Sequence, residues 1–163
     1  MTEDISRNQK NYIGYLALIE DPSHEYFHEA IFIVDDKGYP IDYAYTDRLD
    51  VTPAQRILYG KTLNHYIGVE VCGPKLVEEI NQKPLVIIVN HKDLLDLRKK
   101  IGIPMIFLDD SKKSHDRQKP DIIPHKDYQE DLSKIKRLID TCSNNYDIME
   151  PFDRITKAIM EEI

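Results

Sequence analysis

The strongest constraint on the fold comes from two continuous apolar runs, Leu85–Val89 and Ile103–Leu108, with a helical segment between them. Short apolar runs without alternation are typical of strands buried on both faces, as in parallel sheets. Between the runs, Asn90 and Asp93 indicate a helix cap and an acidic first turn, and Gly102 indicates the helix end. The pattern therefore predicts a β–α–β unit with a right-handed crossover.

Three more strands are predicted before this unit, over Tyr12–Glu20, Ala30–Val34 and Tyr39–Thr46. The first two are apolar on both faces, which indicates central strands. The third alternates in polarity and carries Pro40 near its start, which favours a sheet edge. A tight turn that ends at Gly38 joins the second strand to the third, so the three strands predict an antiparallel meander.

Helices are predicted elsewhere. The segment Thr52-Pro53-Ala54-Gln55 has the form of a capping box and predicts a helix that runs to about Gly68. A short helix is expected after Gly73-Pro74, and two longer ones over about 127–141 and 148–162. The predicted fold class is α/β (α+β): a three-stranded antiparallel meander followed by α-β-α-β with a mixed sheet, and two C-terminal helices.

The length of 163 residues predicts a single domain, 1–163. Residues 1–10 are expected to form a polar N-terminal arm, 111–124 a mobile basic loop, and 127–163 the C-terminal helices packed on the sheet. No apolar run reaches the roughly 20 residues that span a bilayer, and residues 1–10 lack the features of a secretory signal. With only two cysteines, Cys72 and Cys142, a cytoplasmic protein without disulfides is expected.

The formal net charge is −7, and the excess acid lies in the first third of the chain. Because lysine and arginine supply most non-specific affinity for phosphates, direct nucleic-acid binding is predicted to be unlikely. Most of the ten tyrosines also lie in this part, and Tyr39, Tyr43 and Tyr45 share one face of the predicted edge strand. Tyrosine is favoured at protein interfaces, so these three residues are the predicted partner-binding site, with core packing as the alternative.

Acidic side chains follow several predicted strands. Asp109 and Asp110 follow a buried strand, and Asp35 follows an earlier one. Ligands collect at the carboxyl ends of parallel strands, and carboxylates are ligands for Mg²⁺, so these three residues define an alternative metal site. Acidic residues are also common at strand ends and in turns for purely structural reasons. The main prediction therefore includes no metal and no cofactor. His24 and His28 are spaced like a metal-binding pair but lack the remaining ligands, so they are interpreted as surface histidines.

The predicted order β-β-β-α-β-α-β-α resembles the RNase H-like fold over roughly residues 12–140. That resemblance implies an Asp inside the first strand, a Glu on the first helix and an Asp at the end of the fourth strand. Here the first strand interior, Ile13–Ile19, and the helix Pro53–Ile67 contain no acid, and Asn90 follows the fourth strand. A roadblock or longin-like scaffold is similar in its small, helix-flanked sheet and remains a rival.

These observations lead to one main prediction and two alternatives. No catalytic constellation is recognised, so the chain is predicted to be a non-catalytic protein–protein interaction module, an accessory subunit of a larger cytoplasmic assembly with another protein as its partner. The first alternative is a metal-dependent phosphoesterase or nuclease on an RNase H-like scaffold. The second is a small-ligand sensor that uses the crevice beyond Leu108.

Overall fold

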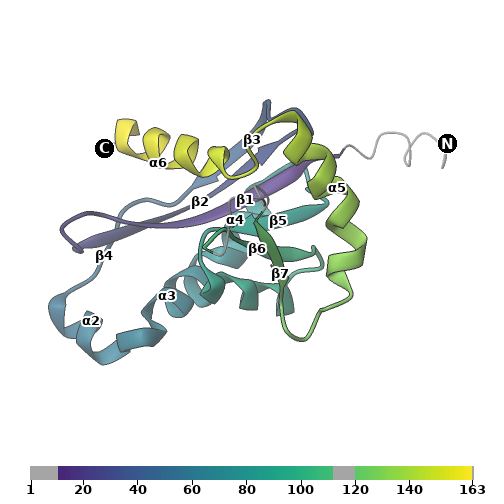
Figure 1. Ribbon diagram of the computed structural model, residues 1–163. Helices are drawn as coiled ribbons and strands as arrows, with labels where there is room; N and C mark the ends of the chain where they lie inside the picture. Colours follow the sequence, from purple (N-terminus) through teal and green to yellow (C-terminus); the bar gives the residue numbers. More distant parts are fainter. Residues whose placement is uncertain (1–10, 112–119, 163) are drawn as a thin grey trace.

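A single mixed sheet forms the centre of the molecule (Figure 1). The computed structural model describes residues 11–111 and 120–162. The strands are β1 (Ile13–Glu20), β2 (Tyr26–Val34), β3 (Pro40–Tyr45), β4 (Leu49–Asp50), β5 (Val86–Val89), β6 (Met105–Asp109) and β7 (Asp121–Pro124). Within the described residues the seven strands form one sheet in the order β3-β2-β1-β5-β6-β7, and β4 pairs with β2.

The strand directions confirm the predicted fold class. β1, β2 and β3 form the antiparallel meander, and β1, β5 and β6 are mutually parallel. β3 lies at one edge of the sheet, as Pro40 predicted. At the other edge, β7 pairs antiparallel with β6. The apolar runs therefore occupy the centre of the sheet, where both faces are covered and only apolar side chains are stable.

Helical layers cover both faces (Figure 1). One apolar core lies between the sheet and the helical segments from residues 63 to 97, and a second lies between the sheet and the two C-terminal helices. The helical elements are α2 (Pro53–Tyr59), η1 (Gly60–Thr62), α3 (Leu63–His65), η2 (Tyr66–Val71), α4 (Gly73–Glu79), η3 (Lys92–Lys99), α5 (Asp131–Asn145) and α6 (Glu150–Glu162). Of these, η1 and η3 are 3₁₀ helices and η2 is a π-helix.

The long helix predicted from Pro53 is interrupted. The capping box of Thr52 and Gln55 is present, but α2 ends at Gly60, which adopts a φ of 53°. A positive φ is open to glycine and breaks the helical ladder. None of the α2 residues is buried, and Ile57 and Leu58 are 78% and 83% exposed.

Other boundaries also differ from the prediction. β2 begins at Tyr26, four residues earlier than expected, because its first half pairs with the end of β1 and with β4. Asn90 does not cap the following helix, since His91 takes that position. Part of the predicted loop 111–124 is strand β7, while residues 112–119, on which its predicted mobility depends, lie outside the described residues.

Among the residues that the structure describes, no helix combines the length and the apolar character needed to cross a bilayer.

Candidate functional site

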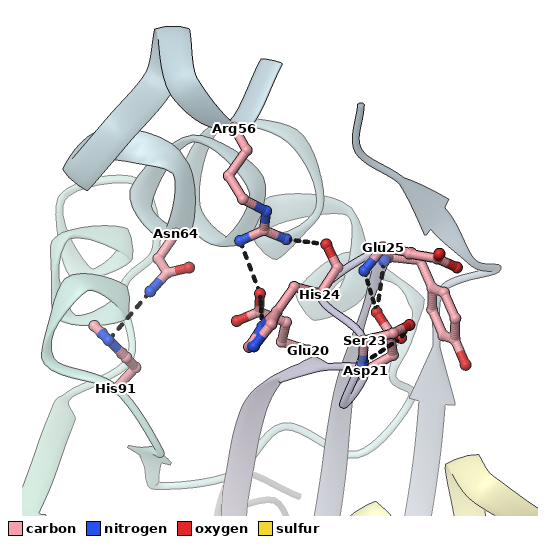
Figure 2. A network of polar contacts seen from close by, with 9 residues as sticks. Glu20, Asp21, Ser23, His24, Glu25, Arg56, Asn64 and His91 are labelled. Atoms are coloured by element: carbon pink, nitrogen blue, oxygen red, sulfur yellow. Dashed lines mark hydrogen bonds and ion pairs between the residues drawn. The ribbon is translucent and has the colours of Figure 1, made fainter. Parts of the chain in front are cut away.

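Polar side chains gather at the carboxyl edge of the parallel strands, where β1 ends in Glu20 and β5 leads into His91 (Figure 2). In open α/β sheets this edge is the usual place for a ligand, because the loops that follow parallel strands converge there. Arg56 from α2 and Asn64 from α3 extend toward this edge. The edge is therefore built from two strand ends and two helical segments.

An ion-pair network joins α2 to the turn between β1 and β2. Glu20 Oε1 lies 2.8 Å from His24 Nδ1 and 2.8 Å from Arg56 Nη1. Arg56 Nη2 also donates to the carbonyl of His24 at 2.6 Å. His24 has a φ of 62°, and its side chain is 68% exposed. A non-glycine residue in the left-handed region is uncommon, and here the Arg56 contacts hold it in place.

Asp21 organises the same turn. Its carboxylate accepts hydrogen bonds from the backbone N–H groups of Ser23 at 3.0 Å, Glu25 at 2.5 Å and Tyr26 at 2.7 Å, and from the Ser23 hydroxyl. Desolvation opposes ionisation, but these donors together lower the pKa of Asp21 to about 2. Asp21 is therefore ionised at neutral pH, and its charge is used in fixing the turn.

Asn64 and His91 form a second contact across the edge, with Asn64 Nδ2 3.2 Å from His91 Nε2. His91 Nδ1 accepts the backbone N–H of Asp93 at 3.2 Å and so caps η3. The neighbouring Asn90 has a different role. Its Oδ1 accepts from Leu18 N and its Nδ2 donates to Leu18 O, both at 3.0 Å, which joins the ends of β1 and β5.

The three carboxylates of the alternative metal site do not come together. Asp109 ends β6 at the carboxyl edge, and Asp110 follows it as an exposed residue. Asp35 follows β2, which runs antiparallel to β1, so it lies at the opposite edge of the sheet. There its carboxylate accepts the N–H groups of Lys37 and Tyr39 and forms a turn.

The described residues therefore do not fit the divalent metal that an RNase H-like nuclease implies. They contain no group of three or more His, Cys, Asp or Glu side chains that could hold a metal ion. On β1, Leu18 is buried and apolar. After β5, the Asn90 amide is engaged on both sides by the Leu18 backbone.

Of the three tyrosines of the predicted partner-binding face, Tyr43 and Tyr45 contact each other, and Tyr39 lies outside the strand. Tyr43 and Tyr45 stack with ring centroids 5.3 Å apart, and Tyr43 also contacts Phe32 edge-on. Tyr39 precedes β3 and is 65% exposed. A register shift in the pairing of β2 with β3 separates Ile41 from Tyr43, which pack against opposite cores. The binding role of these tyrosines stays a prediction.

Several polar residues of interest were not found from the sequence. His28, expected at the surface, is buried, and its Nε2 has no hydrogen-bond partner among the described residues. Glu29 is fully buried, and neither of its carboxyl oxygens has a partner there. Burial raises the pKa of Glu29 to about 9. An acidic residue inside an apolar strand would have indicated a buried carboxyl group. The strand was predicted to begin at Ala30, which left Glu29 outside it.

Similarity to known proteins is found among solved structures. No protein-family model matches, and no curated protein matches. Among solved structures, endonuclease V from Bacillus subtilis is 15% identical with a TM-score of 0.46, covering 64% of this chain and 46% of its own. Endonuclease V from Ciona intestinalis, in complex with a 24mer DNA containing an inosine followed by a ribo-adenosine, is 14% identical with a TM-score of 0.46, covering 82% and 57%.

A third similar structure is Marinitoga piezophila Argonaute in complex with 5′ OH guide RNA. It is 13% identical with a TM-score of 0.32, covering 63% of this chain and 16% of its own. The chain thus spans about half the length of the two endonucleases and less of the Argonaute.

These neighbours correct two predictions. The structures similar to this chain are nucleases and a guide-RNA complex, which contradicts a non-catalytic protein–protein interaction module acting as an accessory subunit. The prediction that direct nucleic-acid binding is unlikely is contradicted by the same structures, because two of them are complexes with DNA or RNA.

Proposed function

We propose that this chain processes nucleic acid, binding it along the carboxyl edge of β1, β5 and β6 and cleaving its phosphodiester bonds. One observation carries the proposal. In the sheet order β3-β2-β1-β5-β6, β2 alone runs opposite to the other strands, and the parallel strands β1, β5 and β6 end at an edge rich in polar side chains. The order of elements along the sequence is the basis of its resemblance to the RNase H-like fold. The proposal retains the nuclease alternative and sets aside its metal site, because the described carboxylates lie apart.

Cationic and hydrogen-bonding groups at this edge support contact with a phosphate backbone. Lys92 is exposed at the start of η3, with its Nζ 5.6 Å from the ring centroid of Phe107 on β6. Lys61 is exposed on η1, between α2 and α3. Lysines contact phosphates as point charges, and neutralising phosphates makes affinity fall with salt. Because the chain carries a net charge of −7, we expect modest, strongly salt-dependent affinity.

A cytoplasmic location is part of the proposal. Cys72 and Cys142 are both buried and not joined in a disulfide, which is the usual state of cysteine in a reducing compartment.

Fluorescence anisotropy with labelled single-stranded RNA, single-stranded DNA and duplex DNA tests the binding, and gel analysis of the same oligonucleotides tests the cleavage. We expect Lys92→Gln to weaken binding and to lower the dependence of log Kd on log salt by about one. Lys157→Gln is the matched control, because Lys157 is exposed on α6, which covers the other face of the sheet. Absence of binding and of cleavage with every oligonucleotide would refute the proposal.

A further inference from the structure

A second polar cluster lies on the helical layer, built around the carboxylate of Asp96 on η3. Two histidines from distant parts of the chain share this carboxylate. His65 Nε2 of α3 lies 2.9 Å from Oδ2, and His125 Nε2, just after β7, lies 2.7 Å from Oδ1. Neither the proposed function nor the sequence patterns assign a role to this cluster.

The hydrogen bonds define where the protons lie. The backbone N–H of Asp127 donates to His125 Nδ1 at 3.0 Å, so Nδ1 is an acceptor and the proton of a neutral His125 is on Nε2. Hydrogen bonds from His125 and then His65 lower the pKa of Asp96, so its carboxylate is ionised and only accepts. His65 therefore donates through Nε2. Its Nδ1 is then the nitrogen that can accept a proton.

The cluster has a buried side and an accessible side. The His125 side chain is 5% exposed and packs edge-on against Tyr128, with ring centroids 5.5 Å apart. The side chains of His65 and Asp96 are 34% and 35% exposed. A buried histidine thus holds one carboxylate oxygen in position, and the other oxygen orients a histidine that a ligand can reach. This is the base-and-orienter arrangement of general-base catalysis.

Two lysines lie around the cluster, and each is paired with a carboxylate. Lys99 Nζ is 3.3 Å from Asp96 Oδ1, and its side chain is 50% exposed. Lys100 Nζ is 2.6 Å from Glu70 Oε2, so the neighbouring anion is already paired. The accessible histidine is thus oriented by Asp96, and the carboxylates of Asp96 and Glu70 are paired with Lys99 and Lys100.

We propose that His65 is the general base of metal-independent RNA cleavage, with Asp96 and His125 as positioning residues. This inference rests on the proposed function and specifies its substrate as RNA. The nucleophile in this inference is the 2′-hydroxyl of RNA, because it is already held beside the phosphorus and a general base can remove its proton. DNA lacks this group and is not a substrate.

The reaction balances without a further reactant. The 2′-hydroxyl proton passes to His65 Nδ1 as the 2′-oxygen bonds to phosphorus. The P–O5′ bond breaks with its electron pair on the 5′-oxygen, which takes a proton from water. His65 then returns its proton to the hydroxide left behind. The products are a 2′,3′-cyclic phosphate and a 5′-hydroxyl end.

The test uses the full chain with a labelled single-stranded RNA and the same sequence as DNA, in EDTA. We expect cleavage of the RNA alone, with a cyclic phosphate end identified by mass spectrometry. His65→Ala should lower kcat by roughly 10²–10⁴-fold, with added imidazole restoring part of the rate. Asp96→Asn should lower kcat with little change in KM, because it disturbs the orientation of the base and not the binding of RNA. His65→Gln, with its folding checked by thermal melting, separates loss of the base from loss of the fold.

The outcomes separate this inference from the proposed function. Cleavage that EDTA abolishes overturns the inference and supports the proposed function. Cleavage in EDTA that is equal in wild type and in folded His65→Gln also overturns it. If no nucleic acid is cleaved under any condition, both are overturned. Lys157→Gln serves as the control variant, since α6 lies on the other face of the sheet.

Discussion

Replacing Glu29 with glutamine should remove a large pH dependence of stability. Glu29 is a fully buried residue of β2, and its carboxyl group has no hydrogen-bond partner among the described residues. It lies against η2, where a Cβ built on Gly68 would be 2.9 Å from Glu29 Oε2. Burial favours the neutral acid and raises its pKa from 4.5 to about 9.

The direction and the size of the effect follow from this raised pKa. The folded state holds the proton more tightly than the unfolded state, so the stability contribution is complete below about pH 4.5 and declines as the pH rises toward 9. Within that window the loss is about 1.4 kcal/mol for each pH unit. Between pH 5 and pH 8 wild type should therefore lose roughly 4 kcal/mol relative to Glu29→Gln, a large share of the 5–15 kcal/mol typical of a domain.

Urea denaturation at several pH values between 5 and 8 measures this difference. With a slope of about 1–3 kcal/mol per molar urea, the midpoint of wild type should move by roughly 2 M relative to the variant. The comparison of slopes is robust to the cost of the buried glutamine amide, because that cost does not depend on pH. Glu78→Gln, at an exposed position of α4, should keep the wild-type slope. Parallel slopes for wild type and Glu29→Gln would refute the reasoning and show that Glu29 is ionised in the fold.

Three further predictions concern packing and polar contacts, each measured by urea denaturation. Asn90→Leu should destabilise by about 2–3 kcal/mol, because it leaves the N–H and C=O groups of Leu18 without their side-chain partner; a change below 0.5 kcal/mol would contradict this. Asp131→Ala should lower the free energy of unfolding by about 3–5 kcal/mol, because it leaves Arg98, 13% exposed, without its carboxylate partner. The double variant Arg98→Met/Asp131→Leu should lower it by less, and an equal or larger loss would contradict this. Gly68→Ala should cost about 1–3 kcal/mol, because its Cβ would lie 2.1 Å from a methyl carbon of Leu94, and wild-type stability would show that η2 relaxes freely.

The sequence alone determined the features that depend on neighbouring residues. The apolar runs at β5 and β6 predicted buried parallel strands, and the alternation with Pro40 predicted the edge strand β3. The capping box at Thr52 is present as predicted, because a cap involves only residues three apart. These elements were sufficient to predict the fold class, because the polarity pattern of a strand shows whether one or both of its faces are buried.

Which polar groups meet depends on the packing of the whole molecule. Asp35 follows β2 and Asp109 ends β6, but the antiparallel direction of β2 puts them at opposite edges of the sheet. Asp96 is joined to histidines 31 and 29 residues away, a contact that no local spacing indicates. Local patterns report the surroundings of a residue along the chain, whereas a site depends on strand order and direction, which are chosen by packing over the whole molecule. The polar clusters of this protein depend on strand order and direction, so their residues could be read from the sequence but their arrangement could not.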